Sequence, residues 1–422
     1  MDFLSQVAQG YKKTFFTLIS TQILQTAFGF LFSFFTTRLI NPEDLGRWSS
    51  SIFFFNIYSI FTDMGIEAGV FESDSDSNDE KMIAAFTFRN ILSFAPLLVS
   101  AFLYQQGSVD IFFLCYALFY WLDKTSNISK INLDINFRQK KASLVELVSF
   151  VFSSLVGVLS VFLNMPIMLI PAQKISEKFF ILIFSFQRNF LHIRTALKNM
   201  NRVGSIIKKF GFATLLSNIA GIFIYDFSPF FLSILLDSKS AGIYTKAFAL
   251  ATFPLLITSV FNRVTTPIYG KFSKDTQICR RVFLYSQIIK FIILAPLFAG
   301  LTITSKYWLT LLGPQWQSAL VVYKILNLYG FARCFYDDLG PLFNLAIGKP
   351  KSFAKIQLLY GLIIFTSSPL IFFYVNDLVT FAIINSCIMV FITLVSWAKA
   401  FKNLGLERSD FQEISNALSI KK

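Results

Sequence analysis

The chain has 422 residues, of which 55% are hydrophobic, 17% are aromatic and only 15% are charged, and its mean hydropathy is +0.60. Soluble domains carry about 25% charged residues, so this composition excludes an ordinary soluble protein and makes the lipid bilayer the expected solvent. The net charge of +14 lies mainly in short segments between apolar runs, which indicates membrane topology rather than nucleic-acid binding.

Apolar runs long enough to cross a bilayer recur along the whole chain. A transmembrane helix needs about 20 apolar residues. The first run, Thr14–Thr37, exceeds a signal-peptide core of about 7 to 15 residues, so we interpret it as the first helix of a multi-pass protein. About twelve spans are predicted, at 15–37, 48–71, 83–103, 110–129, 144–163, 167–187, 210–236, 241–269, 282–303, 318–347, 356–374 and 379–398.

Basic residues alternate between the loops of this twelve-span prediction. Segments on the N-terminal side of the membrane hold 25 Lys and Arg residues, whereas the opposite loops hold 4. Because cytoplasmic loops retain basic residues, the pattern predicts that both termini are cytoplasmic.

The two halves of the chain resemble each other. Leu39–Trp48 aligns with Leu235–Tyr244 at a shift of 196 residues, and Ala95–Leu97 in the third span matches Ala295–Leu297 in the ninth at a shift of 200. Each half is therefore interpreted as one six-helix repeat. Since six is even, both halves enter the membrane in the same sense, as in two-lobed transporters.

The long basic linker after the sixth span is the natural lobe boundary. We predict an N-terminal six-helix lobe at 1–200, a C-terminal six-helix lobe at 201–400 and a cytoplasmic tail at 401–422. Two such lobes are expected to enclose a central cavity.

Nine basic residues fall inside the predicted spans, where each costs about 2.5–3.5 kcal/mol if it faces lipid at mid-depth. Lys124, Lys246 and Lys290 lie near span ends, where snorkelling to the interface accounts for them. Five others are candidate substrate-binding residues of a cationic cavity: Arg89, Lys174, Lys178, Arg263 and Arg333.

The spacing of these candidates favours anion binding. Lys174, Glu177 and Lys178 share one helix face, and a single acid cannot neutralise two lysines. Arginine is always charged and grips a phosphate with two parallel hydrogen bonds. Two alternatives stay open: Arg333 can pair with Asp337 on its own helix, and Arg89 can snorkel to the cytoplasmic end of its helix.

Three acids inside the spans are candidates for ion coupling. Asp63 and Glu67 stack at positions i and i+4, and Asp226 has no neighbouring base in the sequence. These acids either bind a coupling proton or sodium ion or neutralise the cationic residues. No cofactor is expected beyond coupling to such a gradient.

Several signatures of catalysis are missing from the sequence. The four cysteines lie far apart without CxxC spacing, and His192 is the single histidine, so neither a disulfide framework nor a metal site is indicated. A phosphate-binding GxxxxGK[ST] motif is absent, which excludes ATP hydrolysis by this motif. All predicted loops are short and leave no room for a catalytic domain. We therefore expect a transporter and not an enzyme.

Short motifs in the first half resemble a known family. Thr37–Gly46 followed by Asp63–Gly65 is similar to the "RLLGPEDFG … DFG" opening of the polysaccharide-exporting oligosaccharide and O-antigen flippases of the Wzx type. These flippases belong to the multidrug/oligosaccharidyl-lipid/polysaccharide exporter (MOP) superfamily.

The second half agrees with this resemblance. Ala241–Tyr244, Phe253–Leu255 and Thr266–Tyr269 together resemble the family's "GxY … P … P" helix. Leu312–Trp316 is similar to its "lfGxxW" turn, and Gly348–Pro350 to the loop after its tenth helix.

The resemblance implies an all-α integral membrane fold of the MATE-like MOP type, with two six-helix lobes that alternate between inward-open and outward-open states. It implies a flippase of the bacterial inner membrane that moves undecaprenyl-diphosphate-linked oligosaccharide units to the periplasmic leaflet for surface polysaccharides such as lipopolysaccharide O-antigen. The cationic residues would hold the diphosphate and acidic sugars, and a polysaccharide polymerase would be the partner.

Three alternatives are weighed against this hypothesis. A multidrug or cation antiporter of the same superfamily would need an acidic or aromatic cavity, which the buried lysines and arginines disfavour. A polytopic glycosyl polymerase would need a large outer loop. A flippase for the peptidoglycan precursor usually carries more than twelve helices.

Overall fold

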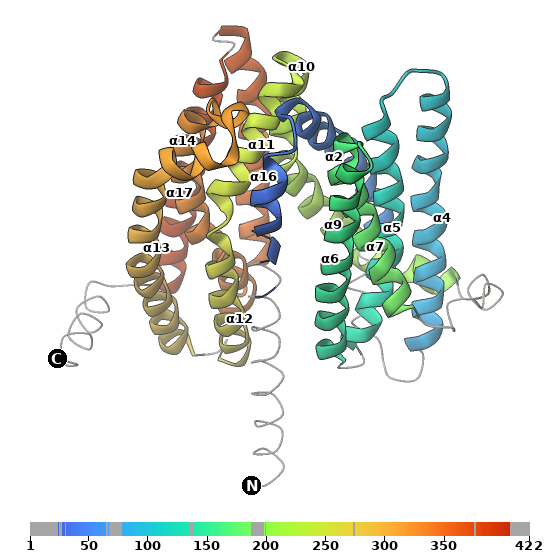
Figure 1. The fold of residues 1–422 in the computed structure, drawn as a ribbon. Helices are drawn as coiled ribbons and strands as arrows, with labels where there is room; N and C mark the ends of the chain where they lie inside the picture. The colour runs from blue at the N-terminus through green and yellow to red at the C-terminus, as the bar shows by residue number, and fades with distance from the viewer. Residues whose placement is uncertain are drawn as a thin grey trace. The chain divides into compact units, whose positions relative to one another are not determined.

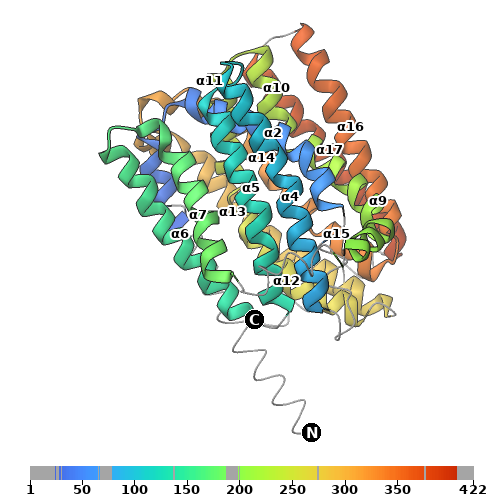
Figure 2. The same ribbon diagram turned by 90° about the vertical axis from the view of Figure 1, so that its right-hand side faces the viewer.

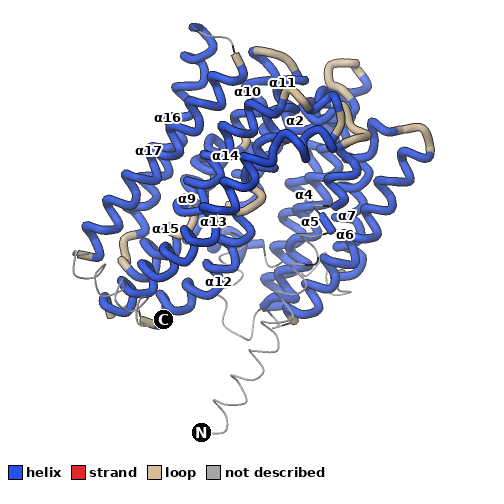
Figure 3. The backbone as a smooth tube through the Cα atoms, turned by 60° about the vertical axis from the view of Figure 1, so that its left-hand side comes forward, coloured by secondary structure: helices blue, strands red, loops and turns tan. Residues whose placement is uncertain are grey.

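The computed structural model is almost entirely helical where it is described, and no strand occurs in those ranges (Figure 3). The chain forms two compact units, residues 1–219 and 220–422. The lobe boundary predicted after residue 200 and the tail from 401 stay predictions. The described residues are 24, 28–29, 31–64, 66, 78–135, 138–186, 198, 200–272, 275–374 and 377–405.

Unit 1 contains the second to sixth predicted spans as helices. The first predicted span lies largely outside the described residues, although 31–37 are helical. The second span begins and ends earlier than predicted, because Asn41 is extended and Pro42 occupies the first helical position, where a proline needs no hydrogen-bond partner. The helices are α2 (Pro42–Asp63), α4 (Asn78–Gln105), α5 (Ile111–Ile135), α6 (Gln139–Phe162) and α7 (Leu169–Ser185), followed by α9 (Met200–Tyr225), which crosses the unit boundary.

Helix α5 is central in unit 1, since it packs against α2, α4, α6 and α7 (Figure 2). Its contact with α2 is an aromatic cluster in which the Trp48 and Phe55 rings of α2 meet Tyr116 of α5 with centroids 4.9 and 5.2 Å apart. Burying large aromatic rings is the main favourable term for such a contact. These ring contacts hold α2 alongside α5.

The remaining predicted spans lie in unit 2, apart from the start of the seventh, and three of them are broken (Figure 1). The seventh bends by 47° at Asp226. The eighth breaks at Phe253 and Pro254, because proline has no backbone N–H to donate to the preceding turn of the helix. The tenth stops at Tyr336 and continues as a short helix and a π-helical turn. The elements are α10 (Phe227–Leu235), α11 (Ser238–Thr252), α12 (Leu255–Lys271), α13 (Thr276–Leu312), α14 (Ala319–Tyr336), α15 (Leu339–Pro341), η5 (Leu342–Ala346), α16 (Pro350–Tyr374) and α17 (Leu378–Leu404).

The predicted repeat is visible in the helix boundaries. Helix α2 begins directly after Asn41 and α11 directly after Asp237, and these two residues are 196 positions apart in the sequence. Pro96 lies inside α4 and Pro296 inside α13. The corresponding segments of the two halves therefore form corresponding helices.

Length and hydropathy make the chain a multi-pass membrane protein. Five helices in the described ranges are long and apolar enough to cross a membrane, and the bent pair of α9 and α10 makes a sixth if counted as one span. The other predicted spans within the described ranges are shorter, broken or more polar. The five are Met82–Gln105, Lys141–Phe162, Thr276–Leu312, Pro350–Leu370 and Leu378–Leu404.

Helices α11 and α14 approach each other at Gly330. A Cβ atom placed there would lie 2.1 Å from the carbonyl oxygen of Ala251, which is backbone and cannot rotate away. We expect Gly330→Ala to destabilise the protein by about 1–3 kcal/mol, because overpacking forces the two helices apart.

The measurement is the melting temperature of the purified protein in detergent, with Gly300→Ala in α13 as the control. A Cβ atom at Gly300 meets nothing within 4 Å, and alanine is the better helix former by about 1 kcal/mol. The control should therefore melt at the wild-type temperature or above it. Equal melting temperatures for the two variants would contradict the close approach.

Candidate functional site

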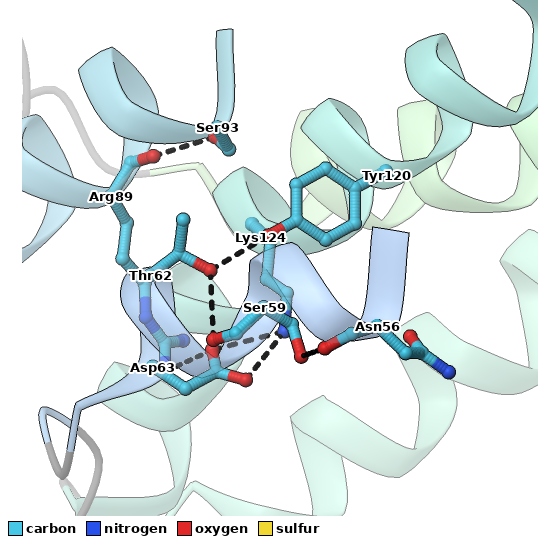
Figure 4. Close-up of polar contacts among 8 residues, drawn as sticks. All are labelled: Asn56, Ser59, Thr62, Asp63, Arg89, Ser93, Tyr120 and Lys124. Atoms are coloured by element: carbon cyan, nitrogen blue, oxygen red, sulfur yellow. Dashed lines mark hydrogen bonds and ion pairs between the residues drawn. The ribbon is translucent and has the colours of Figure 1, made fainter. Parts of the chain in front are cut away.

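Three charged residues from three helices of unit 1 meet at the end of α2 (Figure 4). The Lys124 Nζ atom of α5 lies 2.9 Å from Oδ1 and 2.7 Å from Oδ2 of Asp63. The Arg89 Nη2 atom of α4 lies 3.1 Å from the same Oδ1. Figure 4 shows both cationic ends directed at the one carboxylate. We refer to Asp63, Arg89 and Lys124 as the Asp63 cluster.

The cluster is deeply placed but open on one side. The Arg89 side chain is 0% exposed, whereas those of Lys124 and Asp63 are 14% and 21% exposed. Asp63 and Lys124 therefore form the accessible side, with the guanidinium behind them. A charge taken out of water must be paired, yet here one carboxylate serves two cations. Two cations from two helices therefore converge on the carboxylate of a third.

Contacts that do not involve the Asp63 carboxylate hold the three helices of the cluster together. The hydroxyl oxygens of Thr62 in α2 and Tyr120 in α5 are 2.7 Å apart. Lys124 Nζ also lies 5.5 Å from the centre of the Tyr120 ring, within cation–π range. Trp121 Nε1 donates a hydrogen bond of 3.0 Å to Asn90 Oδ1, which links α5 to α4. The link between the two cation-bearing helices is therefore independent of Asp63.

The other intramembrane lysines predicted in unit 1 each have an acid of their own. Lys178 Nζ lies 2.8 Å from Asp123 Oδ1, and Lys174 Nζ lies 3.4 Å from Glu177 Oε2. The leftover positive charge expected on this helix face is therefore absent, because Asp123 comes from the neighbouring α5.

In unit 2, Arg333 of α14 pairs with Asp337 one turn further along the chain, and the alternative of an intrahelical ion pair is confirmed. Its Nε atom lies 3.6 Å from Asp337 Oδ2, and its guanidinium carbon lies 4.1 Å from the centre of the Tyr225 ring at the end of α9. This geometry is a cation–π contact. Arg333 thereby joins the broken seventh and tenth spans.

A second buried ion pair in unit 2 joins Lys290 of α13 to Asp338. Their side chains are 0% and 6% exposed, and Gln287 Nε2 donates a hydrogen bond of 2.8 Å to Asp338 Oδ2. Asp338 precedes the short helix α15, so the pair ties α13 to the break in the tenth span. Sequence reasoning missed this pair; the only signal was Gln287 and Lys290 three residues apart on one helix face.

The prediction that Lys124, Lys246 and Lys290 snorkel to the interface is wrong. Lys124 and Lys290 are held in interhelical ion pairs, and Lys246 is only 9% exposed. Lys124 does not pair with its sequence neighbour Asp123, since adjacent residues on a helix point in different directions. For Lys124 and Lys290, an acid outside the lysine's own helix determines where the ammonium lies.

The remaining predicted site residues stay predictions. Arg263 lies in α12, but its side chain is outside the described part of the structure, and Glu67 lies outside the described residues altogether. Asp226 lies at the bend between α9 and α10.

The fold is that of the MOP transporters. An inward-facing multidrug resistance MATE family transporter of this superfamily superposes with a TM-score of 0.69 at 12% identity, covering 92% of this chain and 98% of that chain. The lipid II flippase MurJ in an inward closed conformation gives 0.63 at 16% identity, covering 92% and 90%. A MOP superfamily transporter from Pyrococcus furiosus, described by the reverse polarity of its binding pocket, gives 0.58 at 13% identity, covering 92% and 93%.

The sequence also identifies the family. The family model described as "Polysaccharide biosynthesis protein" matches residues 35–321, which is more than half of the chain. The chain belongs to this family, and the resemblance predicted from its motifs is confirmed. No curated protein matches the sequence significantly.

Proposed function

We propose that the protein is a flippase that carries undecaprenyl-diphosphate-linked oligosaccharide units from the cytoplasmic to the periplasmic leaflet by alternating access. Its membership of the polysaccharide biosynthesis family and its transporter fold support a role in moving a polysaccharide precursor. The observation that carries the proposal is the Asp63 cluster, in which two cations face one carboxylate among apolar helices.

The chemistry of a diphosphate fits these two neighbouring cations. A lipid diphosphate brings several negative oxygens into a region of low dielectric, where a charge-assisted hydrogen bond is strong. Arg89 offers a planar fork of donors and Lys124 a point charge, and both are already desolvated. The lipid tail stays in the bilayer. The other predicted cations are proposed to line the path of the sugars: Lys174, Lys178, Arg263 and Arg333.

The acids are assigned two different roles. Asp63 neutralises the cations of its cluster, as its two ion pairs favour. Asp226, at the bend of the seventh span, is proposed as the coupling residue that binds a proton or a sodium ion. Glu67 keeps its predicted coupling role as part of the same proposal.

The proposal places the protein in the bacterial inner membrane with both termini in the cytoplasm, as the distribution of basic residues indicates. The flipped unit would then be delivered to a polysaccharide polymerase on the periplasmic side. A multidrug antiporter is disfavoured, because its cationic substrates favour an acidic or aromatic cavity, whereas the predicted cavity residues are lysines and arginines.

Deletion and complementation in the host test this function. Loss of the gene is expected to abolish surface polysaccharide and to accumulate undecaprenyl-diphosphate-linked oligosaccharide on the cytoplasmic side, and the wild-type chain should restore both. The measurement is the leaflet distribution of the lipid-linked sugar in spheroplasts, together with surface glycan. Unchanged glycan with altered drug tolerance would move the assignment to a multidrug extruder.

A further inference from the structure

Three ion pairs of unit 1 lie at three different depths along helices α5, α6 and α7. Each pair joins one lysine to one acid. In order from the connection between α6 and α7, the pairs are Lys174–Glu177, Lys178–Asp123 and Lys130–Glu146. Lys178 also interacts electrostatically with Glu177 and Glu146, so the three pairs form one connected set. We refer to these six residues as the ion-pair network.

The ion-pair network is electrically balanced, since its three lysines face three acids. An ion pair still offers hydrogen-bonding capacity to a third group, because a carboxylate accepts several hydrogen bonds and an ammonium donates three. The network is therefore polar along its whole length without carrying a net charge.

The exposed part of the network lies away from the lipid-facing side of α7. The six side chains of the network are between 13% and 41% exposed. On the same helix Phe179 and Ile183 are 48% and 50% exposed, and they lie about 140° and about 180° around the helix axis from Lys174. These apolar side chains suit lipid, whereas charges inside a membrane protein face its interior or a water-filled space. The network therefore lines a water-accessible path.

The network adjoins the proposed diphosphate site. Asp123 of the network and Lys124 of the Asp63 cluster are consecutive residues of α5. In the proposed substrate the first sugar is attached directly to the diphosphate, so a diphosphate held at Lys124 places this sugar near Asp123. The network then continues along α5 to Lys130, seven residues or about 10 Å further on. A chain of several sugars therefore meets polar groups along its length.

We propose that the ion-pair network binds the glycan part of the substrate and selects uncharged sugars. This inference rests on the proposed function and names the class of sugar. Each sugar hydroxyl both donates and accepts, so it matches the lysine and the acid of a pair, and hydrogen bonds to charged groups are stronger than those between neutral groups. An acidic sugar gains no net attraction from a balanced set of charges, yet it loses the hydration of its own carboxylate.

The composition of the accumulated substrate tests this selection. The lipid-linked oligosaccharide is purified from the host strain that lacks the gene, released from the diphosphate by mild acid, and analysed by anion-exchange chromatography and mass spectrometry. The expected glycan contains hexoses or N-acetylated amino sugars and no uronic acid or other acidic sugar. An acidic sugar in the unit overturns the inference and leaves the proposed function intact, whereas no accumulation of lipid-linked oligosaccharide removes the proposed function itself.

Removing one pair tests the residues of the network. The double variant Asp123→Asn with Lys178→Met removes both charges and keeps the balance. It should flip the purified lipid-linked oligosaccharide about tenfold more slowly in proteoliposomes, because two charged hydrogen-bonding partners of the sugar are lost. Its binding of farnesyl diphosphate, which carries no sugar, should equal that of the wild type. A purely structural role would lower both activities together.

The matched control is Glu43→Gln with Arg47→Met, which removes an exposed ion pair of α2 in the same unit. It should flip the oligosaccharide at the wild-type rate. If the Asp123 and Lys178 variant does not elute as a folded species, Lys174→Met with Glu177→Gln carries the same test, because that pair lies within one helix.

Two results with the folded variant overturn the inference. Wild-type flipping would leave the ion pairs as contacts between helices, and a matching loss of farnesyl diphosphate binding would show that the effect is not specific to the sugar. No binding of farnesyl diphosphate to the wild type counts instead against the proposed function.

Discussion

Replacing Arg89 by methionine is expected to abolish flipping of the lipid-linked oligosaccharide while leaving a folded protein. The guanidinium is fully buried, and the substitution removes the planar fork of donors that the proposal assigns to the diphosphate while leaving the ion pair of Lys124 with Asp63 in place. Losing one member of a buried, hydrogen-bonded charge set costs about 2–5 kcal/mol, which corresponds to a loss of about 30-fold or more in substrate affinity. The measurement is flipping of a fluorescent polyprenyl-diphosphate sugar in proteoliposomes.

The control for this experiment is Lys324→Met in α14, because Lys324 is an exposed lysine inside a predicted span and lies outside the Asp63 cluster. It should flip the substrate at the wild-type rate. Arg89→Lys keeps the charge but loses the planar fork, and it should retain part of the activity. Wild-type flipping by Arg89→Met would remove the Asp63 cluster from the substrate site.

Breaking the buried pair of Lys290 and Asp338 is expected to have the largest effect on stability. Either Lys290→Met or Asp338→Asn removes one partner and should cost about 3–5 kcal/mol, because an uncompensated charge or polar group is left in the core of unit 2. The Asp338→Asn variant removes the ion pair of the ammonium and leaves the ring of Phe335, 5.4 Å away, as a weaker contact. The melting temperature in detergent should fall for both single variants.

The double variant Lys290→Met with Asp338→Leu separates charge from packing. Replacing a buried ion pair by apolar residues of similar size is often neutral or stabilising, so the double variant should recover most of the lost stability. A double variant as unstable as the single ones would show that shape, not charge pairing, holds α13 to the break in the tenth span. Flipping by a stable double variant would show that the pair serves the fold.

The sequence predicted the helices well because a span needs a long apolar run, and such runs are visible without any knowledge of packing. It also located most of the buried charges. It could not choose their partners, because a partner depends on the rotation of each helix about its axis. Asp63 and Lys124 are 61 residues apart, and the neighbour of Lys124 in the sequence, Asp123, pairs with Lys178 instead. Proline also marks two of the broken spans: Pro254 lies at the break of the eighth span, and Pro229 lies three residues after the bend at Asp226.

The correspondence between the two halves extends from their helix boundaries to their buried charges. Arg89 in α4 lies seven residues before Pro96, and Lys290 in α13 lies six residues before Pro296. In the described part of the second copy, Lys290 has an acid of its own, whereas Arg89 shares its acid with Lys124. In both copies, even so, a cation about two turns before the proline is anchored by an acid from outside its own helix, so the interhelical charge pair, like the proline, is common to the two halves.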